Sequence, residues 1–124
     1  MMMKLAILDT SSILFGLANN LDPFERLRES FPGYKIVVSQ GVVRELAEMS
    51  GSRKKEKVQA KIGLALIKKH LVTVLKGEEY VDSWILGNVK KWDCIVCTND
   101  VGLKQKLKAM GSKAVSLSRS GMLR

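Results

Sequence analysis

The sequence is poor in residues that cross-link a small protein or carry it across a membrane. Its 124 residues include only two cysteines, two prolines, one histidine and seven aromatic residues (two Trp, two Tyr and three Phe). No apolar run approaches the roughly 20 residues of a membrane-spanning helix. The apolar run near the N-terminus is ended by Asp9 without a small-residue cleavage site, which favours a first strand over a signal peptide. We therefore expect one cytoplasmic domain covering residues 1–124, long enough to bury a core.

The two cysteines are separated by two residues, in the run Cys94-Ile95-Val96-Cys97. This spacing occurs in zinc sites and in thiol–disulfide motifs. A zinc site needs two further ligands, and His70 is the only histidine. A redox pair usually opens a helix, whereas these cysteines lie inside an apolar run typical of a strand. The favoured interpretation is a pair of buried core cysteines.

Negative charge is the scarcer sign in this chain. Lys and Arg number 21 against 12 Asp and Glu, which gives a formal net charge of +9. A surplus of this size favours a polyanionic partner, above all nucleic acid. The alternative is a lysine-rich surface that contacts only solvent.

Short apolar runs alternate with segments of helical periodicity along the chain. Strands are expected at 4–8, 35–38, 71–75, 94–98 and 113–117, and the segments between them are expected to be helical. The long helix over 53–70 is expected to bury Val58, Ile62, Ala65 and Leu66. Alternating strands and helices predict an α/β fold with a Rossmann-like, three-layer α/β/α arrangement around a central parallel sheet of about five strands.

The twelve acidic residues fall into two groups by their expected positions. Ligands of such a sheet bind at the carboxyl ends of its strands, beside the point where the strand order reverses. Eight acids are explained as helix caps, exposed helix positions, first-turn acids or a turn at the opposite edge: Asp22, Glu25, Glu29, Glu48, Glu56, Glu78, Glu79 and Asp93. The other four are all expected at the carboxyl edge: Asp9, Glu45, Asp82 and Asp100.

Four carboxylates at one edge are costly without a counter-ion, because they repel one another and lose solvation. No basic residue is placed beside all four of them. A hard divalent cation is the simpler solution, since oxygen ligands suit Mg²⁺ or Mn²⁺. Taken singly, each acid has an alternative role as a cap, a first-turn acid or a solvent-facing helix residue. Their shared edge predicts a metal site.

The same four acids lie in motifs that resemble those of the PIN-domain family. The runs that carry the resemblance are Leu8-Asp9-Thr10-Ser11-Ser12, Val42-Val43-Arg44-Glu45-Leu46, Val81-Asp82-Ser83-Trp84-Ile85-Leu86 and Thr98-Asn99-Asp100-Val101-Gly102-Leu103. The resemblance covers about residues 5–117, and the four motifs occur in the family's order. Three positions depart from it: Ser39-Gln40-Gly41 stands where many members have a proline, Ser83 replaces a second aspartate, and Ser11 replaces a frequent asparagine.

The resemblance implies a ribonuclease that depends on one or two Mg²⁺ or Mn²⁺ ions. Asp9 and Asp100 are expected as direct ligands, with Asp82 and Glu45 completing the metal-binding and catalytic set. Around them, Thr98, Asn99 and Ser11 are expected to orient carboxylates or to touch a phosphate; turn and cap chemistry is the alternative for these three. The candidate nucleic-acid contacts are Arg44, Arg53, Lys54, Lys55, Lys57 and Lys104.

Several biological roles stay open for such a protein. The resemblance is closest to endonucleases that process ribosomal RNA, whose partners include ribosome-assembly proteins. The toxin ribonucleases of toxin–antitoxin pairs are a close alternative, with an antitoxin as partner, and either type admits a homodimer. A PIN module that binds RNA or protein with little or no catalysis is the third. Trp84 and Trp92 lie at helical positions and are expected to pack in the core rather than to stack on bases.

Overall fold

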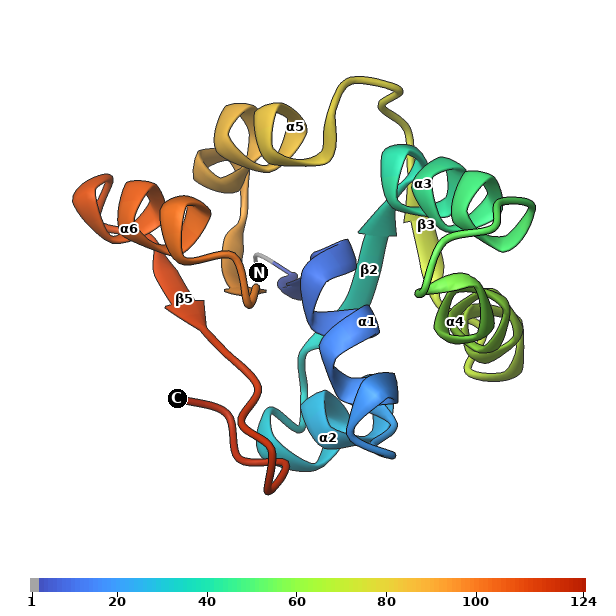
Figure 1. The fold of residues 1–124 in the computed structure, drawn as a ribbon. Coiled ribbons are helices and arrows are strands. Elements are labelled where there is room, and N and C mark those ends of the chain that lie inside the picture. Colours follow the sequence, from blue (N-terminus) through green and yellow to red (C-terminus); the bar gives the residue numbers. More distant parts are fainter. Residues whose placement is uncertain (1–2) are drawn as a thin grey trace.

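A computed structural model describes residues 3–124, so the first two residues of the expected domain lie outside the described part. It contains a five-stranded sheet made of β1 (Lys4–Leu8), β2 (Lys35–Ser39), β3 (Thr73–Leu75), β4 (Asp93–Cys97) and β5 (Lys113–Val115). All neighbouring strands are parallel. The order across the sheet is β3-β2-β1-β4-β5, so the chain moves outward on one side and then returns to the other (Figure 1). The order therefore reverses between β1 and β4.

The helices are α1 (Thr10–Ala18), α2 (Pro23–Ser30), α3 (Gln40–Ser50), α4 (Lys57–Lys69), α5 (Val81–Asn88) and α6 (Val101–Ala109), with a short 3₁₀ helix, η1, at Val89–Lys91. α1 contacts α2, α3 and α4, whereas α5 contacts α6, so the helices form two groups. The central strands are buried from both sides, which explains why they are almost uninterrupted apolar runs. The predicted α/β fold with helical layers around a parallel five-stranded sheet is confirmed.

Local chemistry explains where two of these helices begin. Asp22 caps α2 because its Oδ1 accepts hydrogen bonds from the backbone N–H groups of Phe24 and Glu25, at 3.0 and 3.2 Å. Pro23 follows at the first helical position, where its missing N–H costs nothing. The Ser39 side chain caps α3 by accepting from the N–H of Val42.

The expected buried face of α4 is only partly correct: Leu66 is half-buried and packs against the core, whereas Ala65 is exposed. Val58 and Ile62 are 61% and 43% exposed, and the helix instead buries Ala60, Gly63 and Ile67. A Cβ added to Gly63 would lie 3.0 Å from Cγ2 of Ile13 in α1. At Gly63, α4 therefore packs so closely on α1 that a larger side chain does not fit, whereas Ile67 is buried one turn further along the helix.

Two strands are shorter than expected, and the C-terminal segment forms a hairpin. β3 starts at Thr73 and β5 ends at Val115. Beyond β5, Leu117 pairs in antiparallel fashion with Leu123, and the backbones of Ser116 and Arg124 exchange two hydrogen bonds. Leu117 packs on α1, where a Cβ added to Gly16 would lie 2.9 Å from its Cδ2. The hairpin thus fastens the end of the chain to α1.

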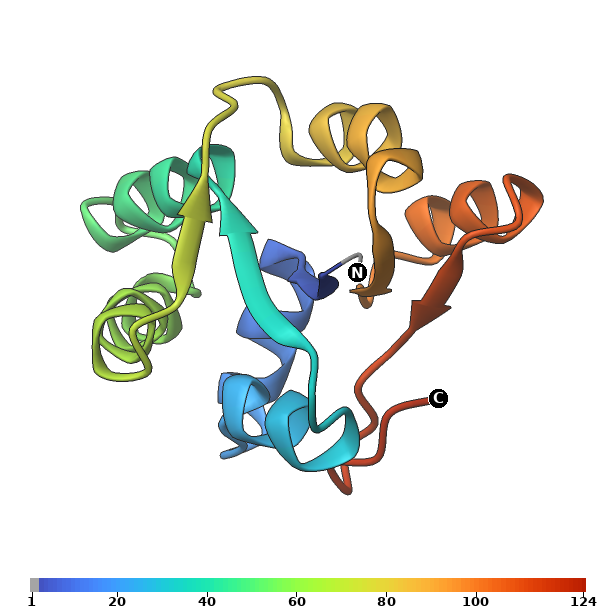
Figure 2. The same ribbon diagram turned by 180° about the vertical axis from the view of Figure 1, so that it is seen from behind.

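Seen from behind, no helix lies in front of β2 and β3 (Figure 2). This side carries a hollow of about 290 Å³, lined by residues that include Leu5, Val37 and Trp92. Trp92 lies 6.1 Å from the ring of Trp84, which is itself only 4% exposed, so both tryptophans pack as expected. Within residues 3–124, no helix combines the length and apolar character needed to cross a bilayer.

Candidate active site

Asp9 lies immediately after β1 and is almost completely buried, at 6% exposure. Its Oδ2 accepts two hydrogen bonds, from the hydroxyls of Ser11 at 2.6 Å and Thr98 at 2.7 Å. Although Asp9 occupies the N-cap position of α1, its side chain makes no cap hydrogen bond. Among the described residues its Oδ1 accepts no hydrogen bond, so helix capping does not explain why a carboxylate is buried here.

Thr98 and Asp100 follow β4, which pairs with β1 in a register that sets Leu8 opposite Cys97. The completely buried hydroxyl of Thr98 donates to Asp9 and accepts from the backbone N–H of Asp100 at 3.1 Å. Asp100 is exposed, and its Oδ1 caps α6 by accepting from the N–H of Leu103 at 3.0 Å. One threonine hydroxyl therefore connects the two acids across the point where the strand order reverses.

Asn99 lies between them and acts as a junction in the scaffold. Its Oδ1 accepts from the hydroxyl of Ser12 at 2.6 Å and from the N–H of Leu117 at 3.1 Å, and its Nδ2 donates to the carbonyl of Leu117 at 2.8 Å. Its backbone N–H donates to the Ser11 hydroxyl at 2.9 Å. These bonds join α1, the end of β4 and the C-terminal hairpin, so the Asn99 amide fixes the surroundings of Asp9 and Asp100.

Glu45 and Asp82 approach from other helices. Glu45 lies in the second turn of α3 and is half-buried, and Asp82 lies exposed in the first turn of α5. Burial raises the pKa of Asp9; the hydroxyls of Ser11 and Thr98 oppose this, and the charges of Asp82 and Asp100 add to it. Each of these aspartates therefore lies within electrostatic reach of Asp9.

The pKa of Glu45 is also raised, first by burial and then by the charges of Asp9 and Asp82. The Thr10 hydroxyl and the charge of Arg44 act in the opposite direction. The structure thus brings all four predicted acids to one edge of the sheet, although Asp9 and Asp100 are far apart in the sequence. Each acid comes from a different strand–helix connection or helix.

The surroundings of these four acids fit a hard divalent cation. Among the described residues, no lysine or arginine nitrogen lies within 4.0 Å of their carboxylate oxygens, although the chain has 21 such residues. No three of the four close to within 4.8 Å of one another, so the acids converge without forming a compact cluster by themselves. The Thr10 hydroxyl is buried beside them and has no hydrogen-bond partner in the described part. An oxygen-only set with an unpartnered polar atom is suited to Mg²⁺ or Mn²⁺.

The predicted basic residues are placed in two ways. Lys104 donates to Ser116 Oγ at 3.0 Å and to the Arg124 carbonyl at 2.9 Å, and partial burial lowers its pKa, so it anchors the C-terminal hairpin. Arg44 donates to the carbonyl of Glu78. By contrast, Arg53, Lys54, Lys55 and Lys57 are exposed on and before the start of α4. These four side chains therefore face solvent, whereas Lys104 and Arg44 form hydrogen bonds within the protein.

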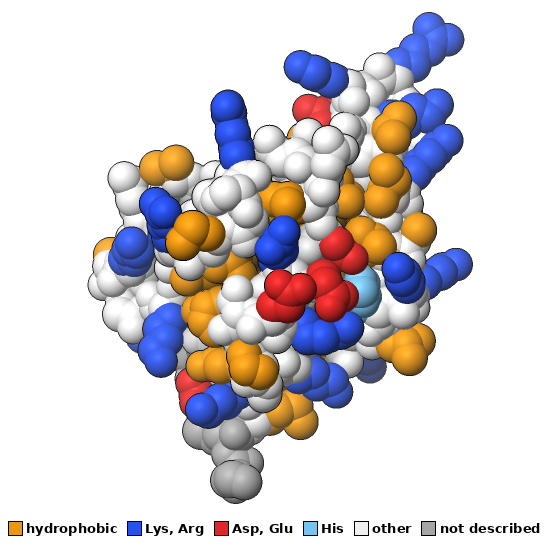
Figure 3. Space-filling model, turned by 90° about the horizontal axis from the view of Figure 1, so that it is seen from below, with side chains coloured by type: hydrophobic (Ala, Val, Ile, Leu, Met, Phe, Trp, Pro, Cys, Tyr) orange, Lys and Arg blue, Asp and Glu red, His pale blue; other side chains and the backbone are white. Residues whose placement is uncertain are grey.

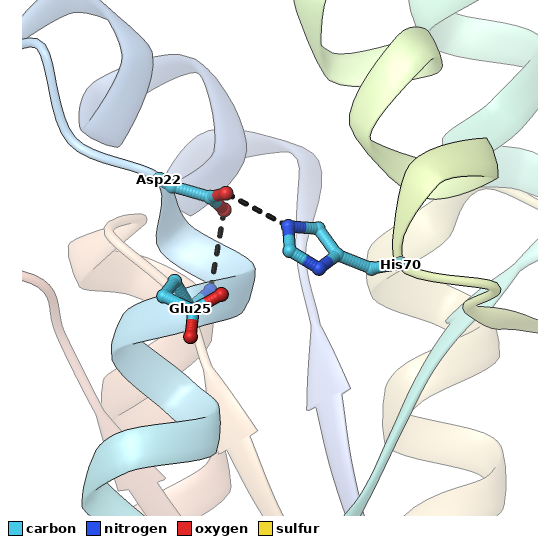
Figure 4. Close-up of side chains that lie close together, drawn as sticks. All are labelled: Asp22, Glu25 and His70. Carbon is cyan, nitrogen blue, oxygen red and sulfur yellow. Dashed lines mark hydrogen bonds and ion pairs between the residues drawn. The ribbon is translucent and has the colours of Figure 1, made fainter.

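A separate group, Asp22, Glu25 and His70, has potential ligand atoms within 4.8 Å of one another (Figure 4). Figure 3 shows red side chains gathered beside the single pale-blue histidine on this face. The His70 Nε2 lies 2.8 Å from Oδ2 of Asp22, whose Oδ1 already caps α2. Glu25 lies 3.8 Å from Arg28. Because each carboxylate has partners within the protein, the group is explained as a link between the end of α4 and the start of α2.

The sequence prediction missed two residues beside the acids. Thr10 was passed over because a polar residue after a strand is normally part of a turn, and its burial depends on α1 starting at that residue. Tyr80 was also missed, since nothing in its local pattern shows that its ring is 81% exposed beside α3 and α5. Cys97 is buried as expected, which raises the pKa of its thiol to about 12, whereas Cys94 is only half-buried and packs against the core.

A parallel α/β domain with acids gathered where its strand order reverses is the architecture of a PIN-type nuclease fold. The family model described as "PIN like domain" matches residues 6–120, and the chain belongs to the PIN-domain family. It is 34% identical over 109 residues to Ribonuclease VapC9 of Archaeoglobus fulgidus, covering 87% of this chain and 78% of that protein. The family predicted from the motifs is therefore confirmed.

Two solved structures share the fold. The PIN domain endonuclease Utp24 superposes with a TM-score of 0.75 and 27% identity, covering 91% of this chain and 84% of that chain. A domain of a functionally unknown protein from Methanocaldococcus jannaschii gives a TM-score of 0.69 at 19% identity, covering 94% and 91%. The second likeness concerns the fold alone.

Proposed function

We propose that this chain is an endoribonuclease that depends on Mg²⁺ or Mn²⁺, with Asp9, Glu45, Asp82 and Asp100 as its metal-binding and catalytic carboxylates. The observation that carries the proposal is the convergence of these acids without a basic partner on a chain of net charge +9. Similarity to proteins named as a ribonuclease and as a PIN domain endonuclease supports the reaction class.

Asp9 and Asp100 are the proposed direct ligands. The hydroxyls of Ser11 and Thr98 hold Oδ2 of Asp9 and leave Oδ1 directed elsewhere, and the N–H of Leu103 holds Oδ1 of Asp100. Both carboxylates are therefore fixed before any ligand arrives, which reduces the entropy lost on binding. When bound, a divalent ion acidifies a water molecule and stabilises the negative charge that develops at phosphorus.

Glu45 is the proposed proton acceptor for the attacking water, and Asp82 completes the set of ligands. Burial and the neighbouring acids raise the pKa of Glu45, which makes its carboxylate a better base than an exposed glutamate. The Thr10 hydroxyl lies close enough to Glu45 to lower its pKa, so it is the proposed group that orients this carboxylate. Arg53, Lys54, Lys55 and Lys57 are the proposed contacts to the RNA backbone, since phosphates must be brought to an acidic site.

The test is cleavage of a structured single-stranded RNA with Mn²⁺, comparing the wild type with Asp9→Asn. We expect the wild type to cut only with metal and the variant to lose more than about 100-fold, beyond the 10–100-fold typical of residues that only support a ligand. Asp93→Asn is the matched control, because Asp93 starts β4 at the opposite edge of the sheet. Equal cutting by wild type and Asp9→Asn, or no cutting by either, contradicts the proposal.

Processing of ribosomal RNA is the proposed biological role, and a toxin ribonuclease restrained by an antitoxin is the second candidate. The toxin role stays a candidate because the chain is more similar to Ribonuclease VapC9, at 34% identity, than to Utp24, at 27%. Expression of the wild type and of Asp9→Asn in a host distinguishes them. Growth arrest by the wild type alone, relieved by a small neighbouring gene product, supports the toxin role; altered precursors of ribosomal RNA without arrest support processing.

A further inference from the structure

Within residues 3–124, Tyr80 is the one exposed aromatic residue, with 81% of its surface accessible. Phe24 and Trp84 are buried, Phe31, Tyr34 and Trp92 pack against the core, and Phe15 is partly buried. An exposed aromatic ring gives up the burial that normally stabilises such a side chain. Tyr80 lines the same hollow as Glu45, so this side chain lies beside the proposed active site.

The backbone that carries Tyr80 is held firmly on α3. The carbonyl of Gly77 accepts from the N–H of Gly41 at 3.2 Å, and the N–H of Gly77 donates to the side chain of Gln40 at 3.0 Å. Arg44 donates to the carbonyl of Glu78, and the carbonyl of Tyr80 itself accepts from the N–H of Trp84 at 2.9 Å. The ring therefore projects from a fixed support rather than from a free loop.

The ring forms one wall of a hollow of about 730 Å³ between α3 and the connection from β3 to α5. This volume is within the range of small-molecule binding sites. The hollow is lined by Tyr80 and Arg44 together with the glutamates Glu45, Glu48, Glu78 and Glu79. The four carboxylates of this hollow repel a phosphate group. A nucleobase is uncharged, and the N–H donors on its edge can bind to the same carboxylates, which act as acceptors. The lining thus suits a nucleobase and excludes the RNA backbone.

We propose that Tyr80 stacks on a nucleobase of the RNA next to the scissile phosphate, and that this hollow is a base-binding subsite. Glu45 belongs both to the hollow and to the proposed catalytic set, so a base on Tyr80 sets the register of the neighbouring phosphate at the carboxylates. The inference rests on the proposed ribonuclease function. Stacking of one base on an aromatic side chain changes affinity by about 5- to 150-fold.

The test measures binding separately from cleavage, in a protein that carries Asp9→Asn. The probes are a short oligoadenylate and a ribose-phosphate oligomer of equal length that lacks bases. We expect Tyr80→Ala to weaken oligoadenylate binding by about 5- to 150-fold, Tyr80→Phe to bind like the parent, and the abasic oligomer to bind both proteins equally. Leu71→Ala is the control, because Leu71 is 87% exposed at the other end of β3.

Two results overturn the inference. One is oligoadenylate affinity that is unchanged by Tyr80→Ala, and the other is an equal loss for the abasic oligomer, which would assign Tyr80 to backbone or protein contacts. With Asp9 intact, Tyr80→Ala is expected to raise KM much more than it lowers kcat. Failure of the proposed function is distinguishable, because a wild type without nuclease activity removes the cleavage assay and leaves the stacking measurement intact.

Discussion

Replacing Asp9 by Asn is expected to reverse the order of stability between wild type and variant when metal is added. The carboxylate is 6% exposed and its pKa is raised by burial and by the charges of Asp82 and Asp100. A raised pKa means that folding favours the neutral form, so the ionised side chain opposes folding at neutral pH. An Asn side chain has no charge, and its carbonyl oxygen accepts the same bonds from Ser11 and Thr98. Without metal, the variant is therefore expected to be the more stable protein.

A bound ion changes this order because it neutralises the charge that opposes folding. At a free Mn²⁺ concentration 100 times the Kd, binding to the folded state stabilises the wild type by about 2.7 kcal/mol. For a chain of this length the gain corresponds to a rise in Tm of roughly 8–16 °C. Asp9→Asn lacks a proposed direct ligand and is expected to gain little.

Thermal unfolding of both proteins, with EDTA and with Mn²⁺, measures the crossover, and Asp93→Asn is expected to behave as the wild type. A variant that is merely damaged is less stable in both conditions, so this pattern separates lost metal binding from a damaged fold. Wild-type protein that shows no shift with Mn²⁺, or a variant that shifts equally, refutes the reasoning.

Three further predictions concern the surroundings of the acids. The pKa values of Asp9 and Glu45 are raised in the folded state, so the metal-free protein is expected to gain stability as pH falls from neutral through those values toward the ordinary values of 3.8 and 4.5. Urea unfolding at several pH values measures the free energy of unfolding. A free energy that falls steadily as pH is lowered contradicts the prediction. Thr98→Val removes the hydroxyl that joins Asp9 and Asp100 and should lower the cleavage rate by about 10- to 100-fold. Thr98→Ser keeps a hydroxyl and should retain most of the wild-type rate. Equal cleavage rates for the two variants would show that the hydroxyl has no role in activity. Reversing charge in Lys54→Glu/Lys55→Glu should weaken RNA binding and reduce the slope of log affinity against log salt by about 1 per lost phosphate contact, measured against Lys113→Glu on the edge strand β5.

The fold and the acidic edge were accessible from the sequence because both depend on local patterns. Apolar runs of strand length, each followed by a helical period, determine a parallel sheet with few alternatives. Asp9 directly follows β1 and Asp100 comes three residues after the end of β4, so their common edge follows once the strands are parallel. Glu45 and Asp82 reach this edge because the helices that carry them, α3 and α5, both start there.

The errors come from contacts between distant segments. The buried face of α4 was assigned to Val58, Ile62, Ala65 and Leu66, but the helix buries Ala60, Gly63 and Ile67, with Gly63 in close contact with α1. Lys104 was a candidate nucleic-acid contact, and the sequence did not show that the C-terminal hairpin folds back and supplies Ser116 and Arg124 as its acceptors. No local pattern reveals such a return of the chain, since the hairpin depends on Leu117 finding its place on α1.

The distribution of the proposed carboxylates along the chain has a consequence for protein synthesis. Asp100 is made 91 residues after Asp9 (100 − 9 = 91) and follows β4, the strand that pairs with β1. Fragments that end before β4 lack both Asp100 and the Thr98 hydroxyl that orients Asp9. A nascent chain is therefore expected to have no assembled nuclease site until β4 and Asp100 have been made. Under the proposed function, the order of translation delays RNA cleavage until both ends of the site are present.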